Sequence, residues 1–408
     1  MNAVLALGAF LAWVPSVTFG LLKADIFPWA FIFALLLNRS RRFFGYLFLL
    51  VVTSLPAVLL GLYNAESWFE FSRSYVAFFN AIILFFFIFT NPSVSIKTLA
   101  PAIKSILLLQ VIISLTQFFG WDSVFQFFVP RSGDAGGARG FTGMSNEPGR
   151  QGIHFILLYS TIFFLDRGLL KYKIYLDVLV FSFMFLINKS LTGILFFSIY
   201  FVLTSSLKTS SFIFLSFAVL LGVLIAQVEL DSRILGFFLR VLLEPEEWFR
   251  LLFDFSGFRF SSVLIVFENI SILGGGVGAW REAISEALNS PGLVESFLTD
   301  RQRQVLMDGV RPTSLLAGLF LEGGGLLVFC WVSICILCAT KERQQLLKTV
   351  KGANLFESVD LSTVRLVRGS VFLSLLSLGL IGSIGSPVAS GTLALSALYS
   401  TLLLRRQA

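Results

Sequence analysis

Residues 26–63 read IFPWAFIFALLLNRSRRFFGYLFLLVVTSLPAVLLGLY, two apolar runs separated by the basic pentapeptide NRSRR at 38–42. A membrane-spanning helix needs about 20 apolar residues, and the second run meets this length while the first is shorter. The connection between the runs carries three arginines. Because positive connections stay in the cytoplasm, the stretch predicts a helical hairpin whose turn lies at the cytoplasmic surface.

The composition of the whole chain extends this prediction. Of the 408 residues, 56% are hydrophobic and only 13% are charged, and the mean hydropathy is +0.86. A soluble domain is about 25% charged. We therefore predict an all-α, polytopic integral membrane protein that forms one transmembrane domain over residues 1–408. No nucleic-acid motif is present, and the first apolar run lacks a basic n-region, so it is interpreted as a retained helix.

The apolar runs predict about twelve helices. Their expected ranges are 2–22, 26–37, 43–63, 74–90, 99–119, 152–165, 172–188, 191–207, 211–228, 313–339, 368–385 and 388–404. With the N-terminus in the cytoplasm, every cytoplasmic connection contains Lys or Arg, including the longest, about 340–367. The short connections on the other side carry only Lys23, Arg73 and Lys189. The positive-inside rule thus places both termini in the cytoplasm.

Two long loops, about 120–151 and 229–312, then lie outside the cytoplasm. Their basic residues are all arginine: Arg131, Arg139, Arg150, Arg233, Arg240, Arg250, Arg259, Arg281, Arg301, Arg303 and Arg311. A loop that only needs solubility would be expected to use lysine as well. The planar guanidinium binds phosphate or carboxylate in a bidentate manner, so the pattern indicates recognition of such an anion. Compositional drift is the alternative explanation.

The stretch RSGDAGGARGFTGMSNEPGRQG at 131–152 is the strongest candidate for a site. Arginines mixed with glycines suit a loop in which backbone N–H groups and guanidinium groups converge on phosphate oxygens. Glu147 lies in the same stretch, and His154, the only histidine, follows it in an apolar helix. The alternative is a solvated loop with incidental charges, in which Glu147 pairs with Arg150 or favours the helix dipole.

The second loop contains three features of its own. ILGFFLRVLLEPEEWFRLLFDFSGFRF has aromatic and charged residues at helical spacing, which predicts an amphipathic segment at the membrane interface. Residues 281–308 predict a polar helical segment broken at Pro291 and Gly292. The glycine run GGGVG at 274–278 lacks the Lys-Ser/Thr of a nucleotide-binding loop, so we expect a close-packed turn that lets backbone approach a ligand.

Three ionisable residues lie inside predicted spanning helices: Lys104, Asp177 and Glu322. Charge at such positions is a candidate for function, although long side chains near helix ends also reach the interface. Glu322 is the strongest of the three because it sits in the run LFLEGGG.

Four local patterns, in this order, resemble the bacterial O-antigen polymerase and O-antigen ligase superfamily. They are RGFTGMSNEPGRQGIHF leading into a helix, LINKSLTGILFF (186–197), Arg259 followed by an apolar run and LGGGVG, and PTSLLAGLFLEGGG (312–325). The topology of the whole chain is similar as well. Two departures stand out: the arginine of the family's second pattern falls on Leu191, and the His-Asn pair of ligases falls on Thr313 and Ser314. The missing histidine favours a polymerase over a ligase.

The resemblance implies a GT-C-like fold and a glycosyltransferase of the bacterial inner membrane. The reaction it implies joins oligosaccharide repeat units carried on undecaprenyl pyrophosphate, at the periplasmic face and without a metal or cofactor. Expected partners are these lipid-linked glycans and the bilayer, with a chain-length regulator and a flippase of the same pathway as candidates.

Roles for individual residues follow from this implied chemistry. Arg259, Arg311 and Arg139 are expected to stabilise the departing pyrophosphate, with Arg150, Arg131 and Lys189 as second choices. Thr313 is an additional substrate-binding candidate. Glu147 is the expected general base on the acceptor hydroxyl, with His154 as the alternative.

Two other functions remain open from the sequence. One is a ligase that transfers finished polymer to lipid A core. The other is a flippase or transporter without chemistry, against which we note that no internal repeat is evident and that charge collects in the two long loops.

Overall fold

The structure is a computed structural model. It describes residues 3–14, 28–121, 141–145, 147–205, 240, 243–247, 258–290, 292, 298, 300–307, 311, 314–349, 361–381 and 384–404. The predicted helix 211–228 and most of the predicted amphipathic segment lie outside the described residues, as do Arg131, Arg139 and Thr313.

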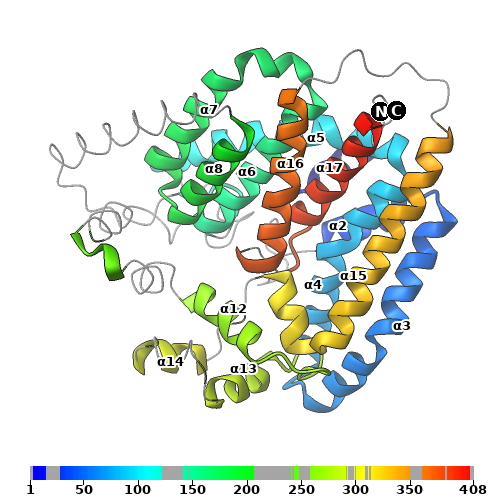
Figure 1. The fold of residues 1–408 in the computed structure, drawn as a ribbon, viewed down its shortest axis with the longest axis vertical. Coiled ribbons are helices and arrows are strands. Elements are labelled where there is room, and N and C mark those ends of the chain that lie inside the picture. The colour runs from blue at the N-terminus through cyan, green and yellow to red at the C-terminus, as the bar shows by residue number, and fades with distance from the viewer. Residues whose placement is uncertain are drawn as a thin grey trace.

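The described residues are mostly helical, with no strand among them (Figure 1). The α-helices are α1 (Ala3–Leu11), α2 (Trp29–Leu37), α3 (Arg41–Asn64), α4 (Trp68–Thr90), α5 (Pro92–Phe118), α6 (Pro148–Leu165), α7 (Lys173–Ser182), α8 (Leu191–Thr204), α12 (Phe258–Glu268), α13 (Trp280–Asn289), α14 (Asp300–Met307), α15 (Leu315–Thr349), α16 (Leu361–Leu376) and α17 (Val388–Leu404). Shorter elements are the 3-10 helices η4 (Arg167–Tyr172) and η6 (Pro245–Glu247) and the π-helices η5 (Phe183–Asn188) and η8 (Ser377–Ile381). The all-helical prediction is confirmed for these residues.

Five helices of the described chain are long and apolar enough to cross a membrane. They are Arg41–Asn64, Trp68–Thr90, Pro101–Phe118, Ser362–Leu380 and Leu315–Gln345, the last of which contains the break at Gly324 described below. This supports a helical membrane protein. The total of about twelve spanning helices and the orientation in the membrane stay predictions.

Several helix boundaries differ from those predicted. Helix α17 has the predicted range, whereas α6 begins at Pro148, four residues before the predicted start at 152. Proline suits the first helical turn because its missing N–H would have no partner there. The predicted cytoplasmic connection 340–367 is shorter than expected, because α15 continues to Thr349 and α16 begins at Leu361. The predicted segment 281–308 consists of two helices, α13 and α14, as the break at Pro291 and Gly292 indicated.

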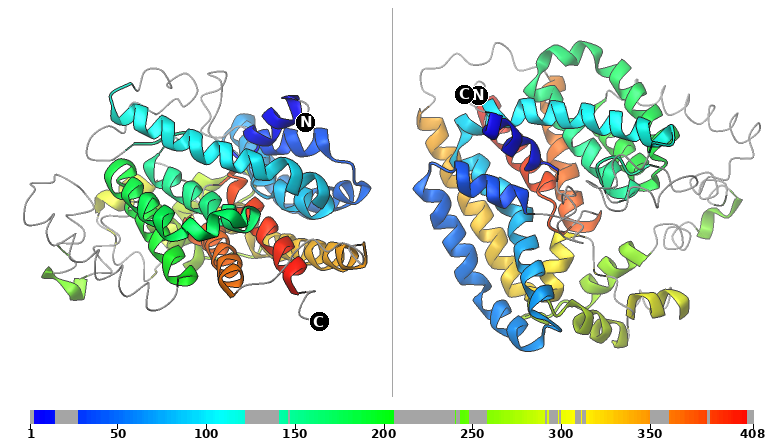
Figure 2. Two further views of the ribbon diagram at one scale, coloured as in Figure 1. Left: turned by 90° about the horizontal axis from the view of Figure 1, so that it is seen from above. Right: turned by 180° about the vertical axis from the view of Figure 1, so that it is seen from behind.

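Helix α4 is the centre of the core. In the most apolar stretch of α4, 72% of the residues are buried inside the protein. The corresponding share in α3 is 28%, so most residues of α3 lie at the surface of the protein. The core of α4 is rich in phenylalanine, and it packs beside α2, α3, α15 and α17 (Figures 1 and 2). Burial of such large rings supplies much of the packing energy of the helical core.

Long-range polar contacts join helix ends that the charge pattern predicts to lie on the same side, while the sidedness itself stays a prediction. Pairs on the expected cytoplasmic side are Arg42 with Glu342 at 3.1 Å, Lys104 with Asp166 at 2.6 Å, and the Arg39 N–H with Asn91 Oδ1 at 3.2 Å. Pairs on the expected outer side are Arg281 with Glu66 at 2.7 Å, Asn64 Nδ2 with Gly275 O at 3.0 Å, and the Gly143 N–H with Gln117 Oε1 at 2.8 Å. Lys104 and Gln117 lie near the ends of the predicted helix 99–119, and the other residues lie in predicted connections; each pair joins positions predicted to share a side.

Helix α15 is not the single spanning helix that was predicted. Gly318 lies against Phe78, and Trp331 stacks edge-on against Phe79 with ring centroids 5.4 Å apart. A straight helix would separate residues 318 and 331 by about 20 Å. Both nevertheless reach the same level of α4, so the chain folds back between them (Figure 1). The reversal occurs at Gly324, whose φ of 73° and ψ of 177° are not helical.

Four backbone hydrogen bonds fill the break in α15. The N–H groups of Gly275 and Gly276 donate to the carbonyls of Leu321 and Glu322 at 2.9 and 2.8 Å. The N–H groups of Gly325 and Leu326 donate to the carbonyls of Ser271 and Ile272 at 2.8 and 3.0 Å. These bonds replace the helical pairs Leu321–Gly325 and Glu322–Leu326, so four backbone groups that the break would leave unsatisfied are paired. We call the interlocked segments 271–276 and 321–326 the glycine junction.

Helix α3 meets the loop that continues from the glycine junction at Gly61. The Val277 N–H donates to Ala57 O at 3.0 Å. A Cβ atom on Gly61 would lie 2.2 Å from Val277 O, and one on Gly276, where φ is +98°, would lie 2.4 Å from Gly61 N. Both obstacles are backbone atoms, so no side-chain rotation would relieve them.

The contact predicts different effects for two alanine substitutions in the same helix. Gly45→Ala meets nothing within 4 Å, and it should leave stability unchanged or raise it by up to about 1 kcal/mol through helix propensity. Gly61→Ala should destabilise the protein by about 1–3 kcal/mol because it overpacks a backbone contact.

Thermal unfolding of both variants in detergent, followed by tryptophan fluorescence, provides the measurement. A Gly61→Ala protein that melts as high as Gly45→Ala would show that α3 and the loop do not touch as described.

Candidate functional site

The start of α6 carries the strongest candidate residues. Glu147 is the N-cap residue, and Arg150 lies in the first turn. Arg150 Nε is 3.6 Å from a carboxylate oxygen of Glu147, and both side chains are largely buried, with exposed fractions of 18% and 23%. The pairing that was considered as an alternative to catalysis is therefore present. It also holds a guanidinium and a carboxylate together at one helix end, where both could contact a substrate.

The turn before α8 packs directly on this helix end. Asn188 Nδ2 donates to Pro148 O at 3.0 Å and to Phe141 O at 3.3 Å. A Cβ atom on Gly152 would lie 2.6 Å from the Cα of Gly193, so α6 and α8 touch through glycines. The next residue after Asn188 is Lys189, the one described non-glycine residue with a positive φ, at 50°. The first two sequence patterns are thus in contact.

His154 lies one turn further along α6 and is buried. Its Nε2 is 2.9 Å from Ser386 Oγ, in the connection between η8 and α17. This hydrogen bond gives the buried Nε2 a partner within the protein. A role for His154 as base stays a prediction.

The connection Ile384–Ser386 contacts several helices at once. Asn80 Nδ2, midway along α4, donates to Gly385 O at 2.7 Å. A Cβ atom on Gly318, in the first arm of α15, would lie 2.6 Å from Ile384. Together with the Ser386–His154 bond, these contacts join α4, α6 and α15 around one short loop.

Arg311 and Glu322 form the second charged pair. The Arg311 guanidinium donates to the Glu322 carboxylate, which is fully buried, and it lies 5.4 Å above the ring of Phe78. The other carboxylate oxygen of Glu322 accepts from the Gly278 N–H at 2.7 Å. Glu322 therefore joins the break in α15 to the GGGVG turn and to Arg311.

The GGGVG turn is close-packed, as predicted. Its nearest neighbours are the protein's own backbone: Gly274 meets residues 322–324, Gly276 meets Gly61, and Gly278 meets Phe71. No ligand is needed to explain these glycines, so the expected approach to a ligand stays a prediction.

Two pairs of candidates are brought together, Glu147 with Arg150 and Arg311 with Glu322. Phe78, which contacts both Arg311 and Gly318, connects the second pair to the loop that binds His154. Arg259 lies in α12, but its side chain is outside the described part of the structure, as are Arg131, Arg139 and Thr313.

The other two intramembrane charges have local partners. Lys104 pairs with Asp166 at the end of α6, and this hydrogen bond lowers the pKa of the Asp166 carboxyl. Asp177 is buried, pairs with Lys173 at 2.5 Å and accepts from Tyr159 Oη at 2.8 Å. These contacts account for both residues without a ligand.

Sequence reasoning missed three polar residues of this region: Asn80, Asn188 and Ser386. Each is buried and makes a long-range hydrogen bond. The available signals were an asparagine inside the apolar run FFNAIILFFF and the small-residue segment GSIGSPV. Both place polar or small residues inside or beside strongly apolar runs.

Comparison of the chain with protein-family models, with curated proteins and with solved structures finds no match.

The second pair allows a test that does not depend on any activity. Glu322→Gln removes the charge that compensates Arg311 and keeps the shape of the side chain. Breaking a buried ion pair costs about 3–5 kcal/mol, so the variant should melt well below the wild type. Removing both charges, as in Arg311→Gln with Glu322→Gln, should recover part of the loss.

Glu286→Gln is the matched control, because Glu286 is exposed on α13 and should be neutral. Equal melting temperatures for Glu322→Gln, Glu286→Gln and the wild type would contradict the contact between Arg311 and Glu322.

Proposed function

We propose that the protein is a polymerase that joins oligosaccharide repeat units carried on undecaprenyl pyrophosphate into a surface polysaccharide, such as O-antigen. The observation that carries the proposal is a pair of arginine–carboxylate contacts, Glu147 with Arg150 and Arg311 with Glu322. Each pair has a neighbour that contacts the connection Ile384–Ser386: His154 on the same helix as the first pair, and Gly318, which shares Phe78 with Arg311. The sequence resemblance supports the same assignment through the same residues.

The proposed reaction requires a base for the acceptor hydroxyl and positive groups that stabilise the leaving pyrophosphate. The hydroxyl of the acceptor sugar attacks the anomeric carbon of the donor, and the bond from that carbon to the pyrophosphate oxygen breaks. The leaving pyrophosphate takes the electron pair, and the hydroxyl proton moves to a base. Fixed guanidinium groups stabilise the developing negative charge, because they need little reorganisation when the charge appears.

Arg150 and Arg311 are the described residues suited to the leaving group. Arg150 lies at the beginning of α6, where the helix dipole also favours an anion. Arg311 is held over Phe78 and by Glu322, so its guanidinium is fixed before substrate binds. Arg131, Arg139, Arg259 and Lys189 complete the proposed cation set, and Thr313 is a further candidate for contact with substrate.

Glu147 is the proposed base. Its carboxylate is partly buried beside Arg150 at the beginning of α6. His154 is less suited to this role because its Nε2 is already engaged with Ser386. The proposed reaction uses neither a metal nor a cofactor. Its proposed setting is the periplasmic face of the bacterial inner membrane, where flippase and chain-length regulator would act with it.

Variants of the first pair test the proposal. Glu147→Gln should lower the polymerisation rate by about 10²–10⁴, the usual contribution of a general base. Arg150→Ala should lower it by about 10²–10³, as the loss of one stabilising donor does. The measurement is the length of the polymer chains, separated on a gel. The polymer is made either by purified protein from lipid-linked repeat units or by a deletion strain that carries each variant.

Arg281→Ala is the matched control, because Arg281 also pairs with a glutamate on the same predicted side but is half exposed. It should give the wild-type ladder. Normal ladders from both Glu147→Gln and Arg150→Ala at normal protein abundance would refute the site. The glycans of the deletion strain separate the three candidate functions. Surface glycan with a single repeat supports a polymerase. Free polymer on its lipid indicates a ligase, and repeats retained in the cytoplasm indicate a flippase.

A further inference from the structure

A shallow hollow with a volume of about 540 Å³ opens between the α2–α3 connection, the start of α3 and the junction of α4 with α5, outside the site proposed above. It is lined by three arginines and four other residues: Arg39, Arg41, Arg42, Ser40, Thr90, Asn91 and Pro92. We call it the arginine groove. All three arginines are exposed, so three guanidinium groups gather around one concave surface.

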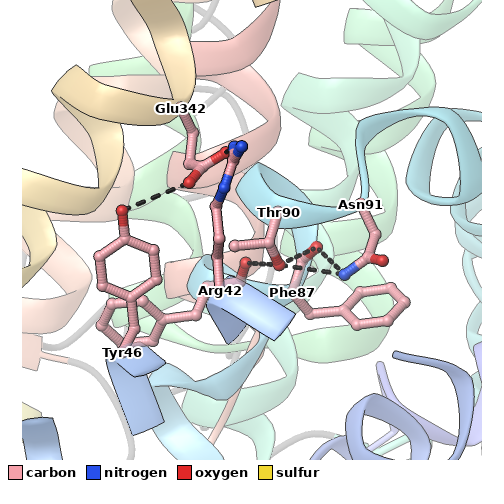
Figure 3. A network of polar contacts seen from close by, with 7 residues as sticks. Arg42, Tyr46, Phe87, Thr90, Asn91 and Glu342 are labelled. Atoms are coloured by element: carbon pink, nitrogen blue, oxygen red, sulfur yellow. Dashed lines mark hydrogen bonds and ion pairs between the residues drawn. The ribbon is translucent and has the colours of Figure 1, made fainter. Parts of the chain in front are cut away.

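The wall of the arginine groove is held by a network of asparagines. Asn91 Nδ2 donates to Asn38 Oδ1 at 3.0 Å, and Asn91 Oδ1 accepts from the Arg39 N–H at 3.2 Å. Asn38 Oδ1 also accepts from the Ser40 N–H at 3.0 Å. These bonds fix the α2–α3 turn against the end of α4, where Figure 3 shows Thr90 and Asn91 beside Arg42. The groove is therefore preformed in the backbone.

The three arginines differ in their partners. Arg42 pairs with Glu342 at 3.1 Å, and Tyr46 Oη donates to the same carboxylate at 3.3 Å (Figure 3). Arg39 and Arg41 form no ion pair with any residue that the structure describes. The groove thus keeps two uncompensated positive charges, which is what an anion of one or two charges would require.

The surface next to the arginine groove is apolar. Helix α3 begins at the groove and exposes large side chains along its length, including Phe44, Phe48, Leu55 and Leu59 with exposed fractions of 47–66%. Leu36 of α2 is 76% exposed at the same end. A ligand with a phosphate head and hydrocarbon chains could place the phosphate among the arginines and the chains along α3.

We propose that the arginine groove binds the phosphate of an anionic phospholipid, whose acyl chains lie against the exposed face of α3. Guanidinium groups bind phosphate through paired hydrogen bonds, and basic clusters beside a spanning helix attract anionic lipids. The proposal does not depend on the reaction proposed above, because none of the residues of the groove belongs to that site.

Lipid titration of the purified full-length protein in detergent tests the proposal, with native mass spectrometry counting bound lipids. Phosphatidylglycerol should bind the wild type, and phosphatidylcholine, which carries no net charge, should bind much more weakly. Arg39→Gln with Arg41→Gln should weaken phosphatidylglycerol binding at least about fivefold. Each basic residue near an anionic lipid contributes about 1 kcal/mol, which corresponds to about fivefold in affinity.

Arg365→Gln with Arg368→Gln is the matched control, since it removes two exposed arginines of α16 that are not part of the groove. It should bind phosphatidylglycerol as the wild type does. Arg39→Lys with Arg41→Lys should fall between wild type and the glutamine variant, because lysine keeps the charge and loses the paired hydrogen bonds.

Two results would overturn the proposal. The first is equal phosphatidylglycerol binding by the groove variant and the control. The second is displacement of the lipid by inorganic phosphate at a matched phosphate concentration, which would identify the ligand as a soluble phosphate compound.

Discussion

The exchange of four backbone hydrogen bonds at the glycine junction is the constraint on which the rest of the described structure depends. Helix α15 breaks at Gly324, and segment 271–276 pairs with two carbonyls before the break and two N–H groups after it. In a membrane an unsatisfied backbone group costs several kcal/mol, so a break of this kind persists only where another segment pairs with it. Glycines are required because Gly274, Gly276 and Gly324 all have positive φ and lie against backbone.

The junction explains why charged residues can lie inside the helical core. Because the first arm of α15 folds back, Glu322 is brought to the Gly278 N–H and to Arg311, and both of its oxygens are satisfied. The same arm carries Gly318 to the connection Ile384–Ser386, which binds Asn80 and His154. The polar residues of α4, α6, α15 and the segment before α17 thus share one network of neighbours, and the proposed substrate site is built on it.

Much of the helical pattern could be predicted from hydropathy, because continuous apolar runs such as 388–404 leave little freedom in where a helix lies. The fold-back of α15 could not, since the run LLAGLFLEGGGLLVF remains apolar across the break and glycine changes its direction without changing its hydropathy. The pairing of Glu147 with Arg150 was readable from their spacing of three residues. The bonds of Glu322 to Gly278 and of His154 to Ser386 were not, because they join residues 44 and 232 positions apart.

The central claim is that one network of helix breaks and charged pairs forms a binding site for a lipid-linked pyrophosphate. A cryo-EM structure of the protein with bound undecaprenyl pyrophosphate, in a lipid nanodisc, tests it most directly. The account predicts pyrophosphate oxygens within hydrogen-bonding distance of Arg150 and Arg311, near the connection Ile384–Ser386, with Glu322 still bound to the Gly278 N–H. Pyrophosphate density remote from both arginines, for example at the opposite ends of the helices near Asn91 and Glu342, would contradict it.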